Sequence, residues 1–156
     1  TRRLMRAAAA LDPARVHVRD LYALYPDYLI DVAAEQALLL QARAVVWLHP
    51  VHWYGMPPLL KLWLDEVFAF GWAYGPGGRA LADKDLWLVA STGGPAESYR
   101  PQGYNRYDFD AFLPPYEPRQ VLDPSDPVSI GAMVGPEAGA VADMGSTVVA
   151  VAGLTF

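Results

Sequence analysis

Apolar residues in the first part of this chain fall into short continuous runs separated by helical stripes. The runs at 44–48 and 86–90 are typical of strands buried on both faces of a sheet. Between them, Pro58 can begin a helix, and the apolar spacing predicts that this helix covers 58–70. Its apolar stripe consists of Leu59, Leu60, Trp63, Leu64 and Val67. Alternation of strand and helix predicts an α/β fold with a parallel sheet.

The region before the first apolar run predicts three more elements. Good helix formers favour a helix over 2–11, and alternation of apolar and polar residues favours a strand over 15–19. A loop rich in tyrosine is expected to follow, at 22–28. Asp31 is then placed to cap a helix over 32–41.

The composition narrows the class of protein. A chain of 156 residues with 53% hydrophobic residues fits a single globular domain over 1–156. The net charge of −5 argues against nucleic-acid binding. The lack of cysteine excludes disulfides and agrees with a reducing, cytoplasmic compartment. No apolar run is long enough to span a membrane, no signal peptide is visible, and no His, Asp and Glu spacing indicates a metal site.

Both ends of the chain depart from what an α/β domain should contain. A doubly wound domain begins with a strand and a phosphate-binding loop, whereas this chain opens on the predicted helix. We therefore expect a truncated N-terminus and a sheet that lacks its first strand. A short helix is predicted over 109–113. The tail at 120–156 is atypical, without Lys, Arg or His, and has two interpretations: a frameshifted segment, or a divergent tail with a short strand within STVVAVAGLTF.

Two loops that follow the buried strands carry the candidate chemistry. HPVHWYG at 49–55 and STGG at 91–94 come directly after strands, and ligands bind at the carboxyl ends of strands in open α/β sheets. Trp53 and Tyr54 offer flat apolar surface, and the glycines let a ring approach the backbone. Such loops suit a planar ring ligand.

Three blocks of sequence then resemble one known family. They are HPVHWYGMPPLLKLWLDEV at 49–67, GWAYGPGGRAL at 71–81 and STGGPAESYRPQGYNR at 91–106. They resemble the flavodoxin-like NAD(P)H:quinone oxidoreductases, the DT-diaphorase family. The bacterial branch, which includes ancillary proteins of glutathione-gated potassium efflux systems, is the most similar. The likeness covers roughly residues 1–117.

This resemblance implies a flavodoxin-like, three-layer sandwich and a flavin enzyme. The implied activity is two-electron reduction of quinones or similar electrophiles by NAD(P)H, with FMN or FAD as cofactor. An alternative is a regulatory ancillary subunit that binds a potassium efflux antiporter and whose redox activity is incidental. A third is a remnant that holds no flavin, because the phosphate loop is missing. For that reason the chain as given is expected to bind flavin weakly or not at all.

The resemblance also implies roles for particular residues. The candidate catalytic residues are Tyr99 and Asn105. Tyr99, together with backbone donors near Gly93 and Gly94, would stabilise charge on the reduced ring, and Asn105 could donate a hydrogen bond. The animal enzymes carry a histidine where this chain has Asn105, and asparagine does not titrate, so the animal charge relay is not expected here. The implied flavin-binding residues are Pro50, Val51, His52, Trp53, Tyr54, Gly55, Thr92, Gly93, Gly94 and Tyr99.

The remaining implications concern partners. Trp72, Tyr74 and Tyr104 are expected to line the pocket for nicotinamide and quinone, with the loop at 71–78 reaching the active site of a partner subunit. This implies a homodimer. The expected location is cytoplasmic, or peripheral at the inner membrane through an efflux partner.

Overall fold

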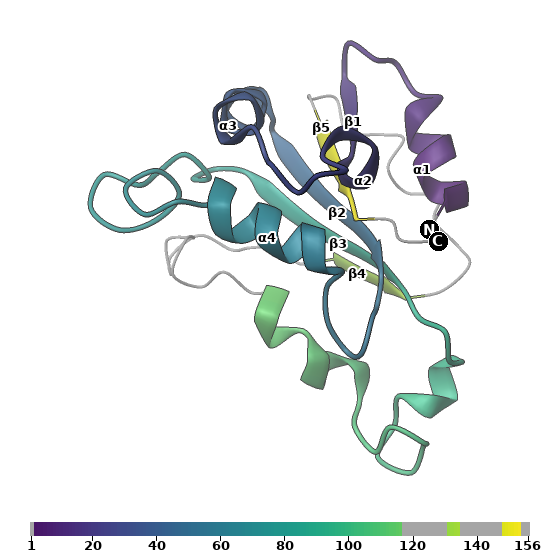
Figure 1. Cartoon of the computed structure of the whole chain (residues 1–156). Helices are drawn as coiled ribbons and strands as arrows, with labels where there is room; N and C mark the ends of the chain where they lie inside the picture. Colours follow the sequence, from purple (N-terminus) through teal and green to yellow (C-terminus); the bar gives the residue numbers. More distant parts are fainter. Residues whose placement is uncertain (1, 117–130, 135–147, 154–156) are drawn as a thin grey trace.

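The computed structural model describes residues 2–116, 131–134 and 148–153, and these contain a five-stranded sheet in the order β1-β5-β2-β3-β4 (Figure 1). All four neighbouring pairs are parallel. The strands are β1 Val16–Asp20, β2 Ala44–Pro50, β3 Asp85–Ser91, β4 Gly131–Val134 and β5 Val148–Ala152. The predicted parallel α/β sheet is therefore confirmed.

Helices cover both faces of this sheet, which makes three layers (Figure 1). Side chains of β2 alternate between the faces: Val45 and Trp47 join the core beneath α4, whereas Val46 and Leu48 join a smaller core beneath α1. The helices are α1 Arg2–Ala9, α2 Leu21–Leu24, α3 Val32–Gln41 and α4 Pro58–Val67, followed by the short 3₁₀ helices η1 Ala96–Ser98, η2 Phe109–Phe112 and η3 Pro114–Tyr116.

Strand β5 comes from the tail but lies in the interior of the sheet, between β1 and β2. In a flavodoxin-like sheet with strand order 2-1-3-4-5, this is the place of the first strand. No strand precedes α1 in the described residues. The expectation that the sheet position would stand open is wrong, because β5 fills it and pairs on both sides. The short strand expected within STVVAVAGLTF is present as β5.

Most other predicted elements are present, with small differences. Asp31 caps α3 as expected, since its side chain accepts a hydrogen bond from the Ala34 backbone N–H at 3.0 Å. The expected tyrosine loop contains the short helix α2. Helix α4 ends at Val67, three residues before the predicted end at Phe70, and α1 ends at Ala9. Strand β4 was not predicted. The rest of the atypical tail lies outside the described residues.

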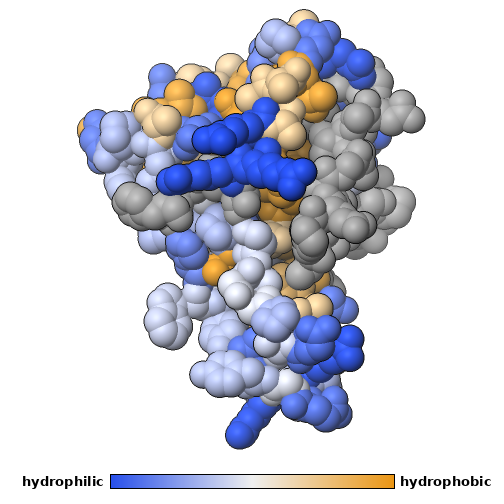
Figure 2. Space-filling model, turned by 90° about the vertical axis from the view of Figure 1, so that its right-hand side faces the viewer, coloured by the Kyte–Doolittle hydropathy of each residue, from blue (hydrophilic) through white to orange (hydrophobic). Residues whose placement is uncertain are grey.

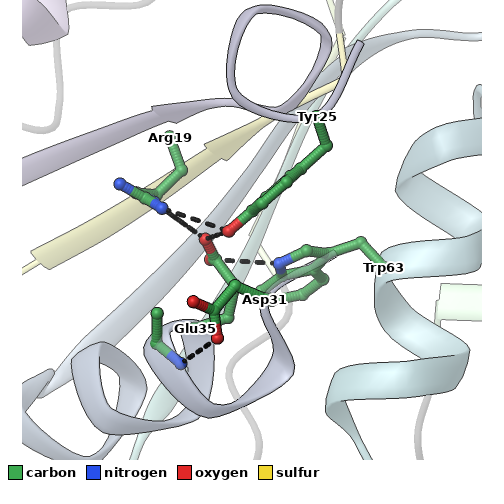
Figure 3. A network of polar contacts seen from close by, with 6 residues as sticks. Arg19, Tyr25, Asp31, Glu35 and Trp63 are labelled. Carbon is green, nitrogen blue, oxygen red and sulfur yellow. Dashed lines mark hydrogen bonds and ion pairs between the residues drawn. The ribbon is translucent and has the colours of Figure 1, made fainter. Parts of the chain in front are cut away.

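A buried carboxylate joins four elements on the α4 face of the sheet (Figure 3). Glu35 of α3 is 0% exposed. Its Oε1 accepts hydrogen bonds from Arg19 of β1, at 2.5 Å from Nη2, and from the Tyr25 hydroxyl after α2, at 2.6 Å. Its Oε2 accepts one from the indole N–H of Trp63 in α4, at 3.1 Å. These bonds fix α3 and α4 against the sheet, and α4 in turn fixes the loop that precedes it.

Candidate functional site

The two loops singled out in the sequence start side by side at the carboxyl edge of the sheet. Pro50 pairs with Ser91 at the ends of β2 and β3. One residue further, the Val51 N–H donates to the Ser91 carbonyl at 2.8 Å. The loops therefore diverge from a common point, as expected for strands that are neighbours in a parallel sheet.

The first loop is a tight turn with an unusual backbone. His52 and Gly55 exchange two backbone hydrogen bonds of 3.0 Å, and the two central residues both have positive φ, 46° for Trp53 and 66° for Tyr54. This is the pattern of a type I′ turn, which normally uses Asn and Gly at those positions. Bulky residues with positive φ cost about 1–3 kcal/mol each, and such strain concentrates at functional sites.

The second loop folds back on itself after η1. The Asn105 N–H donates to the Ser98 carbonyl at 3.0 Å. The return is possible because residue 103 is glycine: a Cβ there would lie 2.3 Å from the Glu97 carbonyl oxygen. Near the strand, the Thr92 hydroxyl donates to the Gly94 carbonyl at 2.9 Å. This fold places Tyr104 and Asn105 next to the start of the loop.

A cavity of about 270 Å³ lies between the two loops. Sites for whole small-molecule ligands usually measure about 300–1,000 Å³, so this cavity lies just below that range and has room for a planar ring system. Its walls combine aromatic rings, glycines and a few polar side chains. The lining residues are Val51, Trp53, Tyr54, Gly93, Gly94, Ser98, Tyr99, Tyr104 and Asn105.

Four of the residues that line the cavity have backbone N–H groups that the described residues themselves do not use. Within the described part of the chain, no hydrogen-bond partner occupies the backbone N–H groups of Trp53, Tyr54, Gly93 and Gly94. A Cβ built at Gly93 would have no described atom within 4 Å, whereas one at Gly94 would be 3.5 Å from Ser98. A flat ring can therefore come close to the backbone at Gly93. The donors and the open glycine together fit the carbonyl- and nitrogen-rich edge of a flavin ring.

Aromatic contacts tie the two loops together. The Tyr54 hydroxyl donates to Asn105 Oδ1 at 3.0 Å, and the Tyr54 ring stacks on Phe112 of η2 with centroids 5.1 Å apart. Tyr99 meets Phe109 and Phe112 edge-on at 5.4 and 6.0 Å. Trp53, by contrast, is 95% exposed. The cavity thus has a packed aromatic wall on the η2 side and one unsupported indole at its rim.

Behind the first loop lies a buried pair of rings. His49 is fully buried, its Nδ1–H donates to the Pro50 carbonyl at 2.8 Å, and its ring stacks on Tyr116 at 5.4 Å. Burial is the main cause that lowers the pKa of His49, so the ring is neutral at pH 7. In the described structure, neither His49 Nε2 nor the Tyr116 hydroxyl has a hydrogen-bond partner. The pair therefore holds η3 under the loop by packing.

Replacing Tyr116 should change stability at alkaline pH. Burial raises the pKa of Tyr116 to about 12, from 10.0. The folded state disfavours the phenolate, so ionisation of Tyr116 does not lower the free energy of unfolding below about pH 10. As the pH rises from 10 towards 12, the free energy of unfolding falls by roughly 2–3 kcal/mol. Tyr116→Phe should flatten the fall in unfolding free energy over that range, and should not destabilise the protein at pH 7, since the hydroxyl is unpaired.

Urea unfolding at pH 7, 10 and 11 measures this effect. Tyr104→Phe, at a ring that is 89% exposed, controls for the loss of a hydroxyl as such. A Tyr116→Phe variant that loses stability above pH 10 as steeply as the parent would contradict the assignment.

The structure brings together part of the predicted site. The predicted residues that line the cavity are Val51, Trp53, Tyr54, Gly93, Gly94, Tyr99, Tyr104 and Asn105. Other predicted residues do not line the cavity but belong to the loops around it: Pro50, His52, Gly55 and Thr92. Ser98 also lines it and was not singled out, since a serine in a turn carries no distinctive signal.

Trp72 and Tyr74 lie elsewhere in this chain. Both pack against the main core, and Tyr74 meets Phe70 edge-on at 5.7 Å. They follow the end of α4, whereas the first cavity loop precedes its beginning (Figure 1). A helix of 10 residues is about 15 Å long. The structure therefore does not place them in the same cavity as Tyr104, and their assignment to the pocket of a partner subunit stays a prediction.

The surface around the segment 92–116 is polar to amphipathic. Figure 2 shows this segment as the lower lobe, coloured mainly white and blue, while the apolar residues gather higher on the same face. In the described ranges, no three His, Cys, Asp or Glu side chains are grouped to hold a metal ion. Nor does any helix there have the length and apolarity needed to cross a membrane.

A family model described as flavodoxin-like fold matches residues 1–122. The chain belongs to this flavodoxin-like family. It is similar to the glutathione-regulated potassium-efflux system ancillary protein KefF of Citrobacter koseri, with 51% identity over 107 residues, which cover 69% of this chain and 60% of that protein. The KefF of Salmonella arizonae is 54% identical over 93 residues, which cover 60% of this chain and 52% of that protein. The matched part thus spans little more than half the length of these relatives.

Solved structures share the fold as well. The general stress protein 14 of Treponema denticola in complex with FMN superposes with a TM-score of 0.74 and 33% identity, over 96% of this chain and 76% of that one. A protein described as a thermophilic tryptophan halogenase of Streptomycin violaceusniger superposes with a TM-score of 0.74 as well. Its identity is 32%, and the match covers 99% of this chain and 80% of that one. Because one fold carries different named activities, function has to be argued from the site.

Proposed function

We propose that this protein takes part in flavin-dependent, two-electron reduction of quinones or similar electrophiles by NAD(P)H. The observation that carries the proposal is the cavity between the two strand ends, with its unpartnered backbone donors at Trp53, Tyr54, Gly93 and Gly94. The FMN complex of a structural neighbour and the quinone-reductase resemblance of the blocks support the same ligand. FMN and FAD share the ring that this cavity would hold.

A bound flavin would supply the redox chemistry, the transfer of a hydride from NAD(P)H to the acceptor. The chain's own residues would bind and orient the ring. Backbone N–H groups at Gly93 and Gly94 would donate to its acceptor edge, and so would Tyr99 and Asn105. Donors fixed by the fold in this way stabilise negative charge without reorganising. Asn105 does not titrate, so no proton is relayed through it.

Replacing Gly93 by valine should weaken flavin binding. The new side chain would extend into the open space where the ring approaches the backbone, so FMN affinity should fall by at least about tenfold. Titration of FMN and FAD, followed by the quenching of flavin fluorescence, measures the dissociation constants. Ala33→Val on α3 adds a similar side chain at an exposed position far from the cavity and should bind as the parent does.

The same experiment tests the proposed function. A parent protein that binds neither flavin, or a Gly93→Val variant that binds with parental affinity, would contradict the site. A parent that binds FMN and consumes NADH or NADPH only when a quinone is present would support the activity.

A second function is favoured by the names of the relatives. The two KefF proteins are named as ancillary proteins of a potassium efflux system, so the protein is also a candidate for a cytoplasmic subunit that binds such a system. Binding to the cytoplasmic domain of an efflux antiporter, measured with the Gly93→Val variant as well as the parent, separates docking from flavin chemistry. Retained docking by that variant would show that the two functions are independent.

We also propose that the protein works as a homodimer in which the loop at 71–78 lies near the partner's cavity. Trp72 and Tyr74 pack against the core and do not line this chain's described cavity, so a role for them in a quinone pocket requires the cavity of a partner. A monomeric mass at micromolar concentration in solution would contradict the dimer.

A further inference from the structure

The turn at 52–55 has a strained backbone conformation. Both central residues, Trp53 and Tyr54, have positive φ, and the two backbone hydrogen bonds of the turn do not by themselves favour bulky residues there. Trp53 is almost entirely exposed and makes no ring contact in the described structure. Strained residues persist where their surroundings over-determine them. Tyr54 makes two contacts that can do so.

Tyr54 bridges the two walls of the cavity. Its hydroxyl donates to Asn105 Oδ1 at 3.0 Å, a contact between residues 51 positions apart in the sequence. Its ring stacks on Phe112 at 5.1 Å with only 17° between the planes. Asn105 is in turn held by its backbone bond to Ser98. Both ends of the bridge line the cavity, so the bridge sets the distance between the turn and the second loop.

We propose that Tyr54 is a positioning residue that fixes the strained turn and also sets the orientation of the Asn105 side chain. Asparagine has one carbonyl oxygen and one NH₂ group. Because the Tyr54 hydroxyl donates to the oxygen, the amide is turned so that its NH₂ group is available to donate to a ligand in the cavity. Asn105 then selects for ligands that present a hydrogen-bond acceptor, such as a ring carbonyl, at that wall. The identification of this ligand as a flavin rests on the proposed function; the bridge itself is a property of the chain.

A set of variants separates the parts of this proposal. Tyr54→Phe keeps the ring that stacks on Phe112 and removes the hydroxyl that binds Asn105. Asn105→Asp keeps an oxygen for Tyr54 but has no NH₂ group. Tyr107→Phe is the matched control, since Tyr107 also meets Phe112, at 6.4 Å, but is 62% exposed and does not line the cavity.

The first measurement is FMN affinity, together with the visible absorption spectrum of bound FMN. We expect Tyr54→Phe to weaken binding about fivefold and to shift the spectrum, Asn105→Asp to weaken it by more than about tenfold, and Tyr107→Phe to change neither. Tyr54→Phe with parental affinity and spectrum would overturn the positioning role. Asn105→Asp with parental affinity would overturn the assignment of Asn105 as a donor.

The second measurement needs no ligand. A double-mutant cycle with Tyr54→Phe and Asn105→Ala, followed by urea unfolding of the flavin-free protein, reports whether the two side chains interact. We expect the double variant to lose less stability than the two single losses combined. Strictly additive losses would overturn the bridge. If the parent binds neither FMN nor FAD, the proposed function fails, and this cycle alone still decides whether the bridge exists.

Discussion

A Val151→Asp variant is expected to lose the cooperative unfolding transition of this protein altogether. Val151 lies in β5, is 0% exposed and pairs with Arg19 of β1 on one side and Trp47 of β2 on the other. The change forfeits the burial of a valine side chain, about 1.5–3 kcal/mol. It also places a carboxylate in an apolar core, which costs several kcal/mol more. The total free energy of unfolding of a small domain is only about 5–15 kcal/mol, so the loss can exceed it.

Circular dichroism during thermal and urea unfolding measures this result. Leu29→Asp introduces the same charge at a residue that is 76% exposed and should unfold with a midpoint close to the parent's. The comparison is informative because β5 comes from the atypical tail, yet occupies an interior place in the sheet. If Val151→Asp unfolded cooperatively at the midpoint of Leu29→Asp, β5 would not be part of the folded sheet in solution.

The elements that the sequence predicts well are those with a complete local signal. Strands β2 and β3 are apolar runs that end in turn residues, and α4 has both a proline start and an apolar stripe. Strand β4 has no such signal, since GAMV is short and lies within a tail rich in alanine and glycine. For β5 the sequence indicates a strand, but it does not indicate that this strand pairs with β1 and β2. Pairing between residues more than a hundred positions apart depends on which sheet edge is free, and local patterns do not contain that information.

The sequence predicts which two loops meet at the candidate cavity but not the details of their geometry, for a similar reason. Carboxyl ends of neighbouring strands and their glycines indicate where a ring ligand would bind. The positive φ values of Trp53 and Tyr54 could not be predicted, because this type of turn is associated with asparagine and glycine. The bond between Tyr54 and Asn105 requires the second loop to fold back at Gly103, which is a tertiary feature.

The same limit applies to Glu35, which the sequence marks only as an acidic residue one turn into a helix. Its burial follows from the partners that three other elements bring to it, so removing it should be costly. Glu35→Ala should lower the unfolding free energy by about 3–5 kcal/mol, the usual loss when one member of a buried ion pair is removed. The variant leaves Arg19 without its carboxylate and the indole N–H of Trp63 without an acceptor.

Further variants separate the charge from the packing in this network. Burial and the nearby Glu35 carboxylate raise the pKa of Tyr25, so its hydroxyl remains a donor, and Tyr25→Phe should cost only about 1 kcal/mol. Combining Arg19→Met with Glu35→Leu replaces the pair by apolar side chains of similar length. It should recover much of the loss, because apolar replacement of a buried pair is often neutral.

Urea unfolding at pH 7 gives these free energies, and an exposed ion pair provides the control. Lys61 and Asp65 lie one turn apart on α4. The Lys61 Nζ atom is 2.5 Å from Asp65 Oδ2, and both side chains are 53% exposed. Asp65→Ala should therefore change stability by no more than about 0.5 kcal/mol. A loss for Glu35→Ala as small as that for Asp65→Ala would mean that the buried carboxylate does not hold α3 and α4 to the sheet, and that the loop before α4 is positioned by apolar packing alone.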